Sequence, residues 1–371
     1  MEALPASTAA ACLLTPDELD ALRAATSSAA LDPASAAVQC RIGLLSSAPA
    51  PASSPANLSS AALPPSSEHA LVSHWASIIG GLCSPKAEFP DAPGLQNRMR
   101  RPEEVQCTAN IFLRRFFVSN SVVNFDPCRV MLACVFLASK IEDAVLDSRN
   151  LSAASEALGK EVPAKDIVEH EPLVLQAMGF QLQQVHGYRP LKAFAEDLRL
   201  YTVRRGWYDK QQCPDFTKLY LKARAWMEET VFSDLPLVHT PAKIALACIV
   251  IALGELPDAD WEKIEADAYL KERFKEQDPG LDVDAFVGDV QDAVQRVKDV
   301  KEGKWGGGAN SIERSVVKAV NKELKKIRTW GKDGEGGAGA AAGGEGEGEK
   351  RKAEGGGGGG AEQSAKRIKT Q

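Results

Sequence analysis

The feature that most constrains the fold of this chain is an internal repeat. Residues 113–140 align without a gap with residues 227–254, so the same pattern returns after 114 residues. In each copy a helical segment leads through a short polar turn to a proline, Pro127 or Pro241. Proline suits the first position of a helix, where its missing N–H costs no hydrogen bond. The repeat therefore predicts two similar units in tandem, each with a second helix that begins at the proline.

The second helix of each copy is apolar on nearly all sides. Residues 132–134 and residues 246–248 both read Leu-Ala-Cys, and the flanking positions are also apolar. A helix without a polar face has to lie at the centre of a bundle. In the polar turn, Ser119 aligns with Ser233 and Asn120 aligns with Asp234. Two helical bundles are the predicted fold, and chance similarity between two buried helices is the alternative explanation of the repeat.

The same helical periodicity extends through residues 66–330. Leu71, Trp75 and Leu82, for example, share one face of a helix. No convincing alternation of apolar and polar residues indicates a strand, so the predicted fold class is all-α. The longest unbroken apolar run, Ile244–Leu253, has ten residues, whereas a membrane span needs about 20. We therefore expect no contact with a membrane.

Both ends of the chain differ in composition from this helical region. Residues 24–65 are rich in Ala, Ser and Pro and are expected to form a linker, preceded by a short helix that Thr15 caps. The segment Asn310–Glu313 has the pattern of a capping box that opens a last helix. The tail from Gly331 onward is low in complexity and is expected to be disordered.

The composition indicates no catalytic, metal or cofactor site. The eight cysteines form no C-x-x-C pair, and with five histidines they give no zinc-binding spacing, so buried free thiols are expected. We find no phosphate-binding loop and no protease, esterase or kinase motif. The formal net charge of −6 also argues against an electrostatic grip on nucleic acid.

Three segments of the chain resemble the cyclin family. They are residues 114–143, which end in Ala138-Ser-Lys-Ile-Glu-Asp143, residues 187–198 and residues 223–252. The resemblance is greatest to the transcription-type cyclins, cyclin H in particular. It implies two tandem five-helix cyclin-box repeats with flanking N- and C-terminal helices. The domains implied are a helix and linker at 1–65, repeats at 66–186 and 187–302, a C-terminal helix at 303–330 and a tail at 331–371.

A cyclin has no catalytic chemistry and activates a cyclin-dependent kinase as its regulatory subunit. Resemblance to cyclin H implies the CDK-activating kinase, which works within transcription factor IIH on the C-terminal repeats of RNA polymerase II. It also implies a RING-finger assembly factor as a further partner and a nuclear location. The alternatives are a C-type cyclin and an adaptor similar to transcription factor IIB, which shares the duplicated fold.

The resemblance also implies a kinase interface centred on Lys140 and Glu171. Lys140 ends the central helix of the first repeat, and Glu171 is expected to orient its ammonium group. The apolar positions expected around this pair are Ile141, Leu175, Phe180 and Leu182, and the rim charges are Glu142 and Lys165. The alternatives are a solvated lysine that caps a helix and apolar residues that belong only to the core.

Two further features of the sequence affect these expectations. Pro172 follows Glu171 directly, and inside a helix it removes a hydrogen bond, so the helix is expected to bend or to restart there. In the tail, two basic clusters suit a bipartite nuclear import signal: Lys350, Arg351 and Lys352, then Lys366, Arg367 and Lys369.

Overall fold

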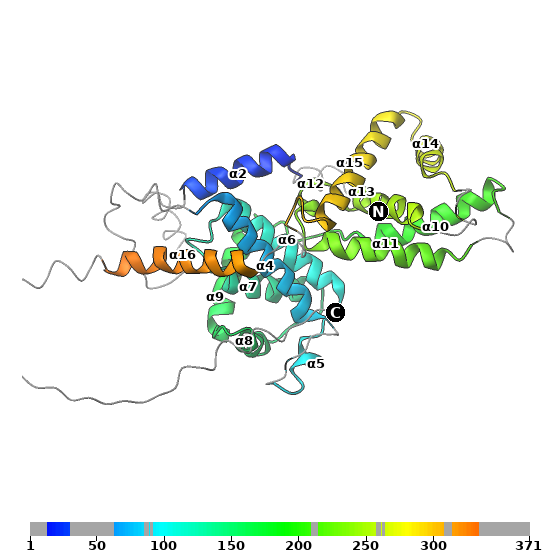
Figure 1. Cartoon of the computed structure of the whole chain (residues 1–371). Helices are drawn as coiled ribbons and strands as arrows, with labels where there is room; N and C mark the ends of the chain where they lie inside the picture. Colours follow the sequence, from blue (N-terminus) through cyan, green and yellow to red (C-terminus); the bar gives the residue numbers. More distant parts are fainter. Residues whose placement is uncertain are drawn as a thin grey trace, which may run out of the picture.

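The computed structural model describes residues 13–29, 63–84, 89, 92–208, 214–256, 261, 264–307 and 314–333. Throughout these residues the chain forms helices joined by turns and loops, with no strand (Figure 1). The prediction of an all-α fold with tandem repeats is confirmed.

The first repeat is a bundle built around α7. Its helices are α4 (Pro65–Cys83), α6 (Glu103–Ser119), α7 (Pro127–Ile141), α8 (Ser148–Ala157) and α9 (Ala164–Ala177), with the short α5 (Leu95–Met99). Pro127 opens α7 as predicted, and the Asp126 carboxylate caps it by accepting from the Cys128 N–H at 2.9 Å. Because α7 packs against α4, α6 and α9, nearly all of its residues are buried.

The second repeat has the same plan around α13. Its helices are α10 (Tyr188–Arg204), α11 (Phe216–Val231), α13 (Pro241–Gly254), α14 (Ala266–Gln277) and α15 (Val283–Lys301), with the short α12 (Leu235–Val238). Pro241 opens α13, and the Thr240 hydroxyl caps it by accepting from the Lys243 N–H at 3.3 Å. In its described residues each repeat thus has five longer helices and one short one. The border predicted at residue 187 falls just before α10 and stays a prediction.

Two helices outside the repeats pack against them. The first, α2 (Pro16–Ala29), lies across α6 and α4 and extends six residues into the segment expected to be linker. The other, α16 (Arg314–Asp333), lies along α4 (Figure 1). It starts later than the expected 303 and ends three residues past the expected 330. The capping box predicted at 310–313 lies outside the described residues.

The segment before α6 contains the short helix α5. The Arg101 guanidinium follows it and donates to the backbone carbonyls of Arg98, Arg100, Ala144 and Val145 at 2.6–2.9 Å. Arg101 therefore ties this segment to the loop that follows α7.

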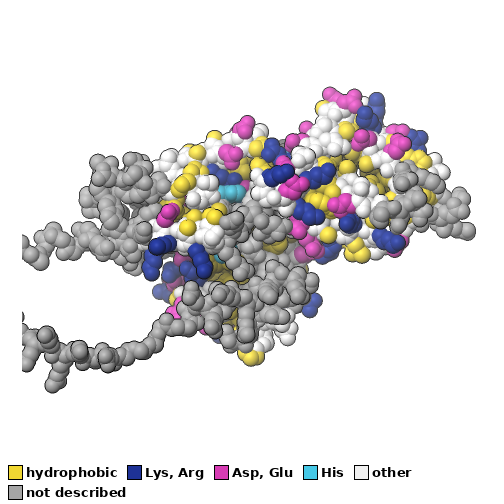
Figure 2. Space-filling model, viewed as in Figure 1, with side chains coloured by type: hydrophobic (Ala, Val, Ile, Leu, Met, Phe, Trp, Pro, Cys, Tyr) yellow, Lys and Arg dark blue, Asp and Glu magenta, His cyan; other side chains and the backbone are white. Residues whose placement is uncertain are grey.

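Figure 2 shows one face of the molecule with its charges. Over the second repeat, Lys and Arg side chains alternate with Asp and Glu side chains on this face. The described residues of this face therefore form no continuous basic surface there.

Candidate functional site

The structure brings Lys140 and Glu171 together as predicted from the sequence. Lys140 lies in the last turn of α7, and Glu171 lies on α9. The ammonium Nζ of Lys140 donates to both carboxylate oxygens of Glu171, at 2.7 and 2.8 Å. The Lys140 side chain is 41% exposed and that of Glu171 is 14% exposed. The pair is therefore formed within this chain and remains accessible on the lysine side.

The position of the Lys140 ammonium is fixed by a second contact. Its Nζ lies 4.0 Å from the centre of the Phe136 ring, a cation–π arrangement that the sequence analysis did not identify. Phe136 precedes Lys140 by one helical turn, so i, i+4 spacing on α7 was the available signal. An ammonium group has three N–H donors. With two of them on Glu171, the third can donate to a carbonyl oxygen of a partner.

Pro172 leaves this arrangement intact. It lies inside α9, which continues through it from Ala164 to Ala177 instead of restarting. Proline has no N–H to donate to the carbonyl of Val168, one turn earlier. Val168 is 45% exposed, on the same helix as Glu171. The helix therefore tolerates the proline in a region that is open to solvent.

The apolar residues predicted around the pair differ in exposure. Ile141, Leu175 and Leu182 are partly buried and pack against the first core, which favours a core role for much of each side chain. Phe180 is 69% exposed and has a φ of +60°. A non-glycine residue in this left-handed region costs about 1–3 kcal/mol, and such strain is found mainly at functional sites. Phe180 is thus the predicted apolar contact that is most available to a partner.

The two predicted rim charges lie in different surroundings. Lys165 is 82% exposed and is 3.5 Å from Glu169 on the same helix. Glu142 is turned inward, where Thr108 donates to its Oε1 at 2.6 Å and His186 Nε2 lies 3.1 Å from the same oxygen. His186 belongs to the connection between the repeats, so Glu142 ties the end of α7 to this connection.

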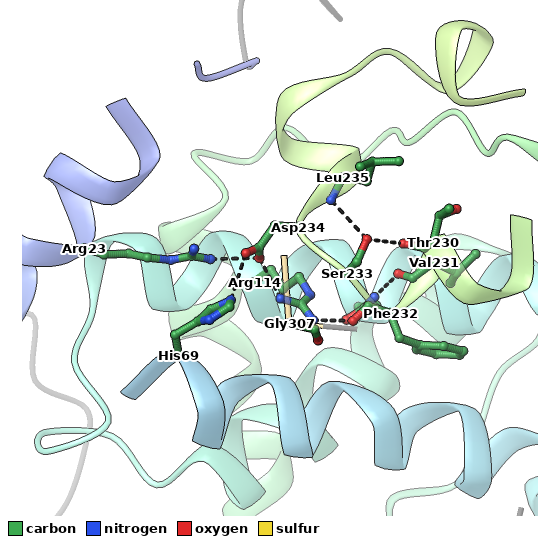
Figure 3. A network of polar contacts seen from close by, with 11 residues as sticks. Arg23, His69, Arg114, Thr230, Val231, Phe232, Ser233, Asp234, Leu235 and Gly307 are labelled. Carbon is green, nitrogen blue, oxygen red and sulfur yellow. Dashed lines mark hydrogen bonds and ion pairs between the residues drawn. The ribbon is translucent and has the colours of Figure 1, made fainter. Parts of the chain in front are cut away.

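A buried polar network lies where the two repeats meet (Figure 3). Asp234 of the second repeat accepts from Arg114 of α6 at 2.6 Å and from Arg23 of α2 at 2.8 Å. Its other oxygen lies 2.8 Å from His69 Nε2 on α4. Arg114 and Asp234 are each 1% exposed. A single carboxylate thus holds α2 and the first repeat against the second repeat.

Electrostatics keep the Asp234 carboxylate ionised. Burial alone raises the pKa of Asp234, but the attraction of Arg114, followed by that of His69 and Arg23, holds this pKa well below its usual range. The sequence analysis did not identify this network. The sequence carries no local signal for it, because Asp234 is only one of several positions at which the aligned turns of the two copies differ.

The segment that follows α15 is part of the same junction. The Asp234 N–H donates to the carbonyl of Gly306 at 3.0 Å. The carbonyl of Gly307 accepts from Arg114 Nη2 at 3.2 Å. Gly307 has a φ of +61°, and a Cβ at this position would lie 2.7 Å from His69 Cε1. The close approach of this segment to α4 therefore requires glycine.

The described residues contain no group of three His, Cys, Asp or Glu side chains that could hold a metal ion. Five described cysteines are free and buried, as predicted: Cys83, Cys107, Cys128, Cys134 and Cys248. Burial raises the pKa of Cys83 and of Cys128 to about 12, so these thiols stay protonated. No described helix has the length and apolar composition of a membrane span. The import-signal residues Lys350–Lys352 and Lys366–Lys369 lie outside the described residues.

Two family models match the chain. The model of the cyclin N-terminal domain matches residues 94–183, and that of the cyclin C-terminal domain matches residues 186–302. Together they account for more than half of the chain. This chain belongs to the cyclin family.

Individual relatives are cyclins of the C and H types. The chain is 33% identical over 164 residues to Cyclin-C1-1 of Arabidopsis thaliana, a match that covers 43% of this chain and 58% of that protein. It is 30% identical over 151 residues to Cyclin-H of Xenopus laevis, a match that covers 40% of this chain and 44% of that protein. The chain thus spans about half the length of these curated relatives.

A solved structure shows the same fold. The chain superposes on a chain of the CAK complex of Chaetomium thermophilum bound to ATP-gamma-S with a TM-score of 0.59 and 16% identity. The superposition covers 92% of this chain and 100% of the other. At this identity the likeness concerns the fold alone.

Proposed function

We propose that this chain is the regulatory subunit of a cyclin-dependent kinase and has no catalytic activity of its own. The observation that supports this most is the Lys140–Glu171 pair at the open end of the first repeat's central helix. The pair is already formed without a partner, and the Lys140 ammonium keeps one N–H free for a carbonyl of the kinase. The exposed Phe180 supplies an apolar contact in the same repeat.

Activation works by differential binding. The kinase samples active and inactive arrangements, and a partner that binds only the active one shifts the population toward it. The kinase element that moves is the helix whose glutamate pairs with the ATP-binding lysine. Because Lys140 and Glu171 are already paired in this chain, less side-chain entropy is lost when the kinase helix docks against them.

We propose, more specifically, that the kinase is the CDK-activating kinase of transcription factor IIH, acting in the nucleus on the C-terminal repeats of RNA polymerase II. Similarity to cyclin H and the fold shared with the CAK complex support this assignment. A RING-finger assembly factor would then be a further partner. The similarity to Cyclin-C1-1 supports a C-type kinase as the alternative. The mixed charges in Figure 2 do not favour the adaptor that binds nucleic acid.

The test measures how strongly the wild-type chain and its Lys140→Glu variant activate the kinase. The chain is co-expressed with the catalytic subunit of the CDK-activating kinase, and phosphorylation of a polymerase C-terminal repeat peptide is measured. Reversing the central charge should lower activity at least about tenfold, because loss of a central interface residue costs about 2 kcal/mol or more. Lys218→Glu is the matched control: this lysine is exposed on α11 of the second repeat, away from the expected interface, so activity should stay within about twofold.

The outcomes separate the parts of the proposal. A complex that forms normally but is unaffected by Lys140→Glu would refute the assigned interface while leaving the kinase partnership intact. Equal losses of kinase activity in both lysine variants would show that activation depends on the overall charge of the chain and not on the Lys140–Glu171 pair. Absence of any complex with this kinase would direct the search to a C-type partner.

A further inference from the structure

Two threonines of the described chain share the same local structure. Thr15 and Thr240 each precede a proline that opens a helix, Pro16 of α2 and Pro241 of α13. The hydroxyl of each threonine accepts from the helix N-terminus, at 3.2 Å from the Glu18 N–H and at 3.3 Å from the Lys243 N–H. A threonine followed by proline is the pair that proline-directed protein kinases modify. The sequence alone therefore does not distinguish the two sites.

The helices that follow the two threonines differ greatly in burial. In α2 only Leu19 and Ser27 are buried, and Leu19 belongs to a small cluster with Val118 and Leu237. Thr15 itself is exposed. In α13 eight residues are buried, and they form the centre of the second core. Thr15 thus begins a peripheral helix, whereas Thr240 begins the most central helix of its repeat.

This difference decides which threonine a kinase can reach. Protein kinases bind their substrates in an extended conformation, so the first helical turn has to unwind around the accepting residue. Segments with few buried contacts open locally at low free energy, and core segments open only with the whole unit. Opening the first turn of α2 releases the Thr15–Glu18 capping bonds, Leu19 and the hydrogen bond from the Leu14 N–H to the Leu237 carbonyl. The same opening at Thr240 would pull Ile244 out of the second core and would release the buried His239, which directly precedes the threonine.

We propose that Thr15 is a phosphorylation site for proline-directed protein kinases, reached by local opening of α2, and that Thr240 is protected. ATP supplies the phosphoryl group. The Thr15 Oγ1 forms a bond to the γ-phosphorus, the bond from that phosphorus to the β–γ bridging oxygen breaks, ADP leaves, and the hydroxyl proton passes to the base of the kinase. The inference is independent of which kinase this cyclin activates.

The refolded helix can accommodate the phosphate. In the unmodified chain the backbone N–H and the hydroxyl of Thr15 donate to Glu18 Oε2 at 2.8 and 2.9 Å, and these bonds lower the pKa of Glu18. A phosphate on Oγ1 repels this carboxylate, and Glu18 is free to turn into solvent because it is exposed. The phosphate then accepts from the N–H groups of the first turn, which favour anions. Phosphorylation of Thr15 therefore replaces the Thr15–Glu18 hydrogen bonds at the start of α2 with a phosphate that caps the same helix.

The experiment compares the two threonines in the folded full-length chain. The chain is incubated with ATP and a purified mitogen-activated protein kinase, and phosphate at each threonine is followed by site-resolved mass spectrometry. This readout separates Thr15 from the Ser-Pro pairs at Ser54 and Ser84. Synthetic peptides of residues 8–23 and 233–248 give the intrinsic rates. When the rate at each threonine in the folded chain is divided by the rate in its peptide, the quotient for Thr15 should be at least about tenfold larger than that for Thr240.

Two variants test the route by local opening. Leu19→Ala removes the buried anchor of α2 and should raise the Thr15 rate several-fold. Leu22→Ala is the matched control on the same helix, because Leu22 is 42% exposed, and it should leave the rate unchanged. The proposal is overturned if folded Thr15 is not modified while its peptide is, if Thr240 matches its rate, or if Leu19→Ala reacts like the wild type.

Discussion

At the junction between the repeats, single residues determine how closely the segments can approach. Gly307 is the clearest case, since its backbone conformation strains any side chain and an added Cβ would lie 2.7 Å from His69 Cε1. Gly206 provides a contrast within the same chain. Its φ of +72° is also left-handed, but an added Cβ there would meet no atom within 4 Å. A Cβ added at Gly206 would meet only the strain of the left-handed backbone, whereas a Cβ added at Gly307 would also collide with neighbouring side chains.

We expect Gly307→Ala to destabilise the chain much more than Gly206→Ala. The left-handed conformation costs an alanine about 1–2 kcal/mol at either position. At position 307 the new methyl group would also collide with Ser73 and His69 and force the segment away from α4. Urea unfolding followed by circular dichroism measures both variants. Equal losses would show that the segment moves aside without cost.

At the scale of the element, α9 combines a functional position with a local defect. Pro172 lies in its interior, directly after Glu171, and leaves the Val168 carbonyl without its helical partner. The helix nevertheless continues, and Glu171 reaches Lys140. Burial of Ile167, His170, Leu173 and Val174 holds the two halves of α9 on the same core. Tertiary packing here outweighs a local preference against helix.

Pro172→Ala should raise the free energy of unfolding by about 2–2.5 kcal/mol. An interior proline costs about 3 kcal/mol, and the greater freedom of alanine in the unfolded chain offsets about 0.4–1 kcal/mol of the gain. Pro65→Ala is the control, because Pro65 opens α4 and has no helical bond to restore. This substitution should slightly lower the stability. A loss of stability in Pro172→Ala would mean that packing requires the bend.

The structural features of this chain differ in how well the amino-acid sequence predicted them. The helices α7 and α13 were predicted with their first residues, because a proline cap and an apolar run are local signals. The Lys140–Glu171 pair followed from resemblance and is present in the structure. The Asp234 network was not predicted, since it joins residues up to 211 positions apart, and no local pattern records such contacts. The short α5 also has too few residues to show periodicity.

For the whole molecule, the Asp234 network is the main polar link between the two repeats. Arg114 and Asp234 come from different repeats, and both are almost completely buried. Removal of one partner leaves the other charge buried without compensation, which costs about 3–5 kcal/mol. We expect Asp234→Asn to lower the free energy of unfolding by this amount. Asp197→Asn, which breaks a more exposed pair with Arg273, should cost about 1 kcal/mol or less.

The effect of Asp234→Asn should depend on pH. Folding lowers the pKa of Asp234. The contribution of this carboxylate to stability is therefore complete at pH values above the pKa that Asp234 has in the unfolded chain. The contribution declines as the pH falls through the lowered pKa. Urea unfolding should therefore show the full difference between wild type and variant from about pH 5 to pH 8, and a shrinking difference below about pH 4. A constant difference down to pH 3 would contradict the assignment.

The position of α16 has a consequence for the order in which the molecule is made. Val317, Val320 and Leu324 of this helix are buried in the core of the first repeat, although the whole second repeat precedes them in the chain. Synthesis on the ribosome proceeds from the N-terminus, and domains usually fold as they emerge. Here the bundle that begins first is completed last. Until α16 has been synthesised, the apolar face of α4 that it covers stays open to other chains or to a chaperone.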